Sequence, residues 1–143
     1  MERHPIQLVN ITVDELYIKS LDRDFSDKNY PKEFSLTVSR SEYDSDEKAI
    51  SVRLELNLAP DGNEIDRPFE MRILIAGHFE VDEDNFDVTL VDKFAEVNAP
   101  ILLIPYMREQ AYSLSLRAGM EPVIFPLVTV PIFRIARQEE GGS

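Results

Sequence analysis

The chain has 143 residues and a formal net charge of −12, from 27 acidic and 15 basic side chains. This length predicts a single domain, residues 1–143, that buries its own core without disulfides or metals. The absence of cysteine excludes thiolate catalysis and cysteine-bound zinc, and two histidines are too few for a histidine-rich metal site. The negative charge disfavours nucleic acid as a partner, because phosphate binding depends on lysine and arginine.

The amino terminus lacks the basic segment and long apolar run of a signal sequence. The longest apolar stretch, near residues 97–107, is about half of a membrane span. We therefore expect a cytoplasmic protein without direct membrane insertion.

A first strand is predicted at residues 8–19, although its alternation of apolar and polar side chains is irregular. Leu16-Tyr17-Ile18 breaks the phase, and a bulge near Asp14 and Glu15 would repair it. The polar segment that follows, residues 20–32, is too long for a tight hairpin. We therefore expect the chain to cross over after the first strand.

Three more strands follow before the first predicted helix. Residues 34–39 and 49–58 alternate with period two, which indicates strands with one solvated face, and the acidic turn 41–48 joins them as a hairpin. Asp61-Gly62 provides turn chemistry before the last strand, residues 69–81. The pattern predicts an α+β fold in which a four-stranded antiparallel sheet, with a crossover after its first strand, carries helices on one face.

Helices are predicted in the second half of the chain. A short amphipathic piece at residues 88–97 precedes a longer helix, with Asn98 as its cap, Pro100 in its first turn and Gly119 beyond its end. Its sheet-facing stripe contains Leu103, Met107, Ala111, Leu114 and Ala118. The other side is amphipathic and predicts a symmetric subunit contact. This predicted oligomer interface consists of Leu102, Tyr106, Glu109, Tyr112, Ser113 and Leu116.

The apolar tail is interrupted by Pro126 and Pro131, which favours an extended segment and then a short helix starting near Pro131. Residues 139–143 are expected to be disordered. Apolar side chains here and on the second strand have two interpretations, an ordinary core or an exposed groove for unfolded polypeptides. The candidate client-binding residues are Phe34, Leu36, Val38, Phe125, Val128, Val130, Ile132 and Phe133.

The sequence contains no motif that demands an enzyme. An EF-hand reading of the acidic residues 82–87 fails, because Asp87 stands where glycine is required and Lys93 where glutamate is required. His78 has no neighbouring nucleophile motif and is interpreted as a strand histidine with a satisfied hydrogen bond. Carboxylate pairs that meet only in the folded protein stay open at this point. We expect no catalytic residue, metal or cofactor.

One stretch is far more specific, the run Asn98-Ala99-Pro100-Ile101-Leu102-Leu103-Ile104-Pro105-Tyr106-Met107-Arg108-Glu109. It resembles the helix signature of the SecB family of export chaperones, and Leu16-Tyr17-Ile18-Lys19 is similar to the family's first strand. The resemblance covers nearly the whole chain. It implies a homotetramer, built as a dimer of dimers, that holds unfolded precursor proteins for export without ATP.

The resemblance also implies a docking surface for the SecA motor. Here that surface would contain Asp24, Glu70 and Arg72, although Arg72 reverses the charge of a family carboxylate and Ser20 replaces another acid. Two alternatives therefore stand beside the export chaperone. One is a SecB-like chaperone dedicated to a specific client, such as an antitoxin, and the other is an oligomeric interaction subunit without chaperone activity.

Overall fold

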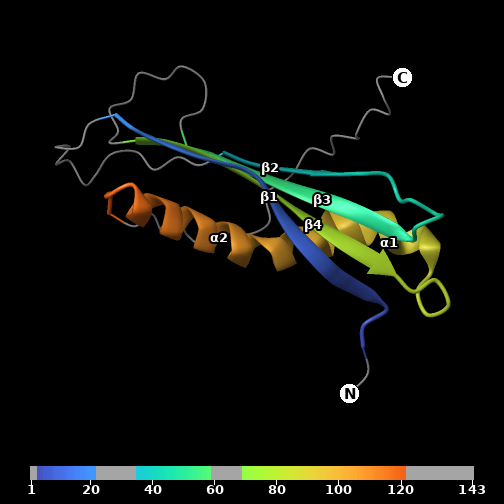
Figure 1. Cartoon of the computed structure of the whole chain (residues 1–143). Coiled ribbons are helices and arrows are strands. Elements are labelled where there is room, and N and C mark those ends of the chain that lie inside the picture. The colour runs from blue at the N-terminus through green and yellow to red at the C-terminus, as the bar shows by residue number, and fades with distance from the viewer. Residues whose placement is uncertain (1–2, 22–34, 59–68, 122–143) are drawn as a thin grey trace.

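The structure is a computed structural model that describes residues 3–21, 35–58 and 69–121 (Figure 1). Its strands are β1 (Ile6–Ser20), β2 (Ser35–Arg40), β3 (Ala49–Leu58) and β4 (Phe69–Val81). Its helices are the 3₁₀ turn η1 (Val88–Leu90), α1 (Val91–Lys93), the π-helical turn η2 (Phe94–Asn98) and α2 (Ala99–Arg117). The short helix expected near Pro131 and the disorder expected at residues 139–143 lie outside the described residues.

The four strands form one antiparallel sheet in the order β1-β4-β3-β2. Strands β2, β3 and β4 are neighbours in sequence and in space, whereas β1 joins the far edge beside β4. The chain must therefore pass from one edge of the sheet to the other between β1 and β2. This confirms the crossover, and the helices of the described residues lie on one face of the sheet, as the α+β prediction required (Figure 1).

The irregular alternation of β1 comes from two register shifts against β4. One lies between Leu8 and Asn10 and the other between Val13 and Glu15. The second leaves Asp14 without a partner, which is the bulge that the phase break predicted. The first shift was not predicted.

The core lies between the sheet and the helices. Alternate residues of β4 point into it, because neighbouring side chains of a strand lie on opposite faces. Helix α2 contacts β1, β3 and β4, with most of the predicted stripe fully buried. The largest buried side chains are Phe69, Phe79, Ile50, Leu54, Leu56, Met71, Ile73, Ile75, Leu103, Met107 and Val38.

The ends of α2 follow the predicted bounds, but its start is built differently. Asn98 makes no capping hydrogen bond with its side chain, because the preceding π-helical turn already satisfies Ala99 N–H through the carbonyl of Phe94. The predicted cap was therefore wrong. At the other end, Gly119 adopts φ 80° and donates to Leu116 O at 3.0 Å, while Met120 donates to Ser115 O at 3.0 Å. This pair of hydrogen bonds is a Schellman motif, which favours glycine at the left-handed position.

A buried arginine joins β2 to the helices. Arg40 is only 8% exposed, and its Nε donates to Glu96 Oε2 at 2.8 Å. Its Nη1 lies 3.4 Å from Asp92 Oδ1 and donates to the carbonyl of Ser41 at 3.1 Å. This group was not predicted from the sequence, although Arg40 shares the inward phase of Leu36 and Val38.

Tyr43, between β2 and β3, donates to Glu83 Oε2 at 2.6 Å. Burial raises its pKa to about 12, and the hydrogen bond to Glu83 acts in the same direction. The folded protein favours the neutral phenol of Tyr43. The contribution of this preference to the free energy of unfolding is complete below the unfolded pKa of about 10 and is lost as the pH rises towards 12. We expect Tyr43→Phe to remove a late step from the tyrosinate absorbance titration. An unchanged titration at high pH would contradict the assignment.

Candidate functional site

The side of α2 that faces away from the sheet is largely apolar. Ile101, Leu102, Tyr106, Tyr112 and Leu116 are between 41% and 53% exposed. They lie together because the buried stripe occupies the opposite half of the helix. A strip of this kind on one helix is typical of a contact with another protein. We call these five residues the helix strip.

The predicted interface residues thus all lie on one side of α2. Leu102, Tyr106, Tyr112 and Leu116 belong to the helix strip, Glu109 is exposed between them and Ser113 is half-buried. Sequence reasoning omitted Ile101, the most exposed of the apolar group at 53%. Its position one turn before Pro105 and Tyr106 was the available signal.

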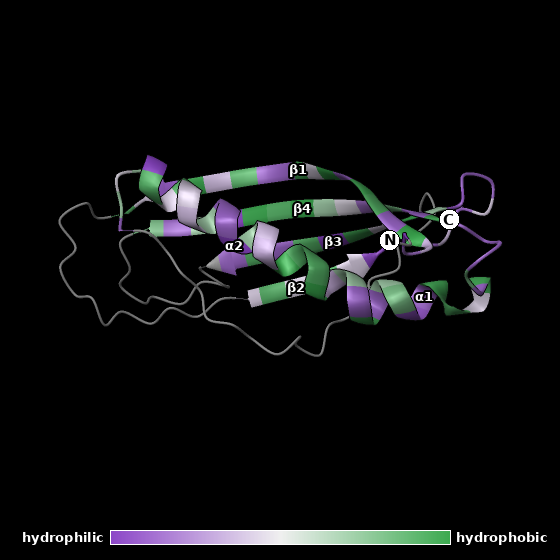
Figure 2. Cartoon of the chain, turned by 90° about the horizontal axis from the view of Figure 1, so that it is seen from below, coloured by the Kyte–Doolittle hydropathy of each residue, from purple (hydrophilic) through white to green (hydrophobic). Residues whose placement is uncertain are grey.

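A second exposed apolar set follows the edge strand. Val9, Val13, Leu16 and, just beyond β1, Leu21 are between 37% and 51% exposed. In the described chain β1 pairs with β4 alone, so the backbone groups of its other edge have no strand beside them. Such an edge favours pairing with another strand. Figure 2 shows α2 running obliquely across the sheet with its C-terminal end nearest β1, which it contacts.

The face of the sheet opposite the helices carries a polar cluster at β1 and β4. Arg72 donates to both carboxylate oxygens of Glu15, through Nε at 2.8 Å and Nη2 at 3.2 Å. Its guanidinium also lies 5.1 Å from the ring centroid of Tyr17, whose hydroxyl donates to Glu70 Oε1 at 2.9 Å. We call these four residues the polar cluster. Of the predicted motor-docking residues, Glu70 and Arg72 come together here, and Asp24 lies outside the described residues.

His78 lies on the same face and bridges three strands. Its Nε2 is 3.0 Å from Thr12 Oγ1 on β1, and its Nδ1 is 2.8 Å from Ser51 Oγ on β3. Both ring nitrogens therefore have partners, as the strand-histidine interpretation expected.

The predicted client-binding residues are only partly described. Val38 is 2% exposed and belongs to the core, because it points towards the helices from β2. Val38 is therefore not available to a client polypeptide in this chain, contrary to the prediction. Leu36, on the same side, is half-buried against the core. The remaining candidates, Phe34, Phe125, Val128, Val130, Ile132 and Phe133, lie outside the described residues.

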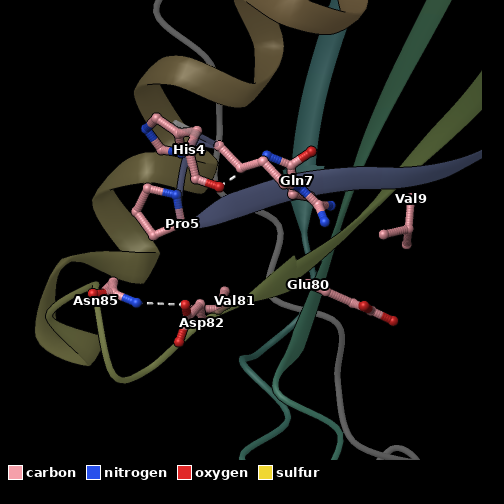
Figure 3. Close-up of a pocket in the computed structure, with 9 residues that line it drawn as sticks. His4, Pro5, Gln7, Val9, Glu80, Val81, Asp82 and Asn85 are labelled. Atoms are coloured by element: carbon pink, nitrogen blue, oxygen red, sulfur yellow. Dashed lines mark hydrogen bonds between the residues drawn. The ribbon is translucent and has the colours of Figure 1, made fainter. Parts of the chain in front are cut away.

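An open pocket lies where β1 begins and β4 ends (Figure 3). Gln7 donates to the carbonyl of His4 at 2.8 Å, and Asn85 donates to Asp82 Oδ2 at 2.7 Å. The lining of the pocket is mostly polar and carries both charges, and it meets the exposed apolar set of β1 only at Val9. The lining residues are Arg3, His4, Pro5, Gln7, Val9, Glu80, Val81, Asp82 and Asn85.

The described residues form neither a metal site nor a membrane-spanning helix. Residues 3–21, 35–58 and 69–121 contain no group of three or more histidine, aspartate or glutamate side chains placed to hold a metal ion. Within the same ranges, no helix combines the length and the apolar character needed to span a bilayer.

Comparisons with known proteins agree with this fold. The protein-export protein SecB of Magnetococcus marinus is 26% identical over 140 residues, which cover 92% of this chain and 87% of that protein. An uncharacterized protein of Methanocaldococcus jannaschii is 35% identical over 63 residues, or 44% of this chain. The match spans only 39% of the length of that archaeal protein. No protein-family model matches the chain.

Among solved structures, the Mycobacterium tuberculosis SecB-like chaperone Rv1957, in complex with a ChAD peptide from the HigA1 antitoxin, superimposes with a TM-score of 0.66. The match has 20% sequence identity and covers 90% of this chain and 94% of that one. The fold is therefore that of the SecB-like proteins. The resemblance to the SecB family that the helix motif indicated is confirmed along most of the chain.

Proposed function

We propose that this chain is a molecular chaperone of the SecB type, a holdase that binds unfolded precursor polypeptides in the cytoplasm without ATP. The observation that carries the proposal is the match to the protein-export protein SecB over 92% of the chain, together with the SecB-like fold. A holdase needs apolar surface that tolerates many sequences, and it needs no catalytic group. The net charge of −12 keeps such a surface in solution.

Assembly is part of the proposal. We infer that the helix strip and the free edge of β1 are covered by further copies of the chain, in a tetramer built as a dimer of dimers. A symmetric contact suits one strip on each chain, because the same patch serves both partners. Clients would then bind at the surfaces left open, for which Leu36 is the described candidate.

The test of the proposal measures mass and chaperone activity on one sample. Light scattering gives the oligomeric mass, and aggregation of several unrelated, chemically unfolded proteins is followed without nucleotide. We expect a tetramer that suppresses the aggregation of each of them. A monomer, or an oligomer without effect on any of them, would overturn the proposal.

The helix strip itself is tested by a charged double variant. Tyr106→Glu with Tyr112→Glu should weaken assembly by about a hundredfold, because two carboxylates would be buried at the contact. The chain should stay folded, since both side chains are exposed in the single chain. Tyr106→Phe with Tyr112→Phe is the matched control and should keep the mass. An unchanged mass for the charged variant would show that the strip is not the interface.

A dedicated chaperone is the second candidate. The mycobacterial SecB-like chaperone is bound to an antitoxin peptide, which supports a specific client here as well. In the polar cluster, Arg72 forms an ion pair with the Glu15 carboxylate and Tyr17 donates a hydrogen bond to Glu70. Both carboxylates already have a partner within the chain, so they are less available to a SecA-type motor. The range of clients distinguishes the dedicated chaperone from the general one. A dedicated chaperone should bind one polypeptide tightly and should not suppress the aggregation of unrelated proteins. A titration with SecA then tests the export form.

A further inference from the structure

The bulge in β1 decides which side chains face the helices. Val13 and Leu16 are three residues apart, so in a regular strand they would point to opposite faces of the sheet. In the structure they pair with Ile75 and Ile73, which both point into the core. The unpaired Asp14 provides the extra residue that brings Val13 and Leu16 to the same side.

The polar cluster begins directly after this bulge and lies on the opposite face. Tyr17 pairs with Arg72 across the two strands, while Glu15 and Glu70 occupy the diagonal positions on either side. The hydrogen bonds of Arg72 to Glu15 and of Tyr17 to Glu70 therefore join β1 to β4 twice. The Glu15 carboxylate also raises the pKa of Arg72.

These contacts exist only in the bulged register. If Asp14 entered the ladder opposite Leu74, Glu15 would fall opposite Ile73 and Tyr17 opposite Met71, on the core side. Every side chain after the bulge would change faces, because the side-chain period of a strand is two. Such a slip would break both links and place the Glu15 carboxylate where Leu16 now lies, beside the fully buried Ile73.

We propose that Glu15, Tyr17, Glu70 and Arg72 form a register latch, which holds the bulge at Asp14 and so positions Leu16 beside Val13 on the helix side, for contact with a second copy of the chain. This inference rests on the assembly proposed above. Both apolar side chains are more than a third exposed, and α2 contacts β1, so one partner seated on the helix strip would also reach them. Arg72 is thus a positioning residue that acts from the opposite face.

The first experiment measures how strongly the register latch protects the backbone of β1 within one chain. Arg72→Gln and Glu15→Gln should each speed amide hydrogen exchange in residues 15–19 by about fivefold, the size expected for an exposed ion pair. The charge swap Glu15→Arg with Arg72→Glu should restore the protection. Arg53→Gln is the matched control, because Arg53 is exposed on the same face, on β3, outside the polar cluster. Unchanged exchange in Arg72→Gln would overturn the proposal.

The second experiment measures assembly by light scattering over a dilution series. Arg72→Gln should raise the concentration needed for assembly, the charge swap should restore it and Arg53→Gln should leave it unchanged. If the swap restores exchange protection but not assembly, Arg72 touches the partner directly and the positioning role is wrong. A monomeric wild-type chain would overturn the assembly proposal, and with it the contact role of Val13 and Leu16, while the exchange experiment still tests the latch.

Discussion

Replacing Leu103 with alanine is expected to lower the free energy of unfolding by about 3 to 5 kcal/mol. Leu103 is fully buried where α2 packs on the sheet. A cavity there would not close, because the helix and the strands are held by many other contacts. Urea denaturation followed by circular dichroism measures the change.

Gly77 is the partner in this contact. A Cβ at Gly77 would lie 2.7 Å from Leu103 Cδ2 and 3.2 Å from Phe79 Cε1, so Gly77→Ala should cost about 1 to 3 kcal/mol through overpacking. The double variant Gly77→Ala/Leu103→Ala should cost less than the sum, because the missing leucine leaves space for the new methyl group.

Gly119→Ala combined with Leu103→Ala is the control for the double variant of Gly77 and Leu103. The φ of 80° at Gly119 makes any side chain cost about 1 to 2 kcal/mol, and no space is shared with Leu103, so those two changes should be additive. A fully additive result for Gly77 with Leu103 would contradict the close approach of α2 to β4.

Arg40→Met is expected to cost about 2 to 4 kcal/mol, because it leaves the partly buried Glu96 carboxylate without its closest cation. Methionine keeps much of the side-chain volume, so most of the loss reflects charge and hydrogen bonding rather than a cavity. The measurement is again the free energy of unfolding in urea.

The matched test of that cause is the double variant Arg40→Met/Glu96→Gln, which removes both charges. It should be more stable than Arg40→Met alone, since no unpaired carboxylate remains. If it is less stable than the single variant, the arginine stabilises the fold through packing and not through its link from β2 to η2.

Several elements were predictable because their signal is local. The alternation of residues 49–58 predicted β3 to the residue, and the phase break at Leu16-Tyr17-Ile18 predicted the bulge at Asp14. Pro100 and Gly119 bracketed α2. Asn98 was misjudged, because a cap is needed only where a helix starts from non-helical backbone, and here a π-helical turn leads into it.

The contents of the candidate site were less predictable. Alternation along β2 predicted that Val38 and Leu36 share a face, but it could not predict that the helices cover this face. Arg72 was expected as a changed charge on a docking surface, whereas its partner Glu15 lies 57 positions away in the chain. Arg40 and Glu96 are separated by 56 positions, so neither residue signals the other.

Periodicity, turn residues and one helix motif depend on neighbours along the chain, so they were enough to predict the four strands, the long helix α2, the α+β class and the likeness to SecB. The tertiary structure decided which faces are buried, which apolar residues stay exposed on α2 and β1, and which charges pair. The physical reason is the sheet order, since the crossover brings β1 beside β4. Contacts between such distant segments exist only after the chain has folded.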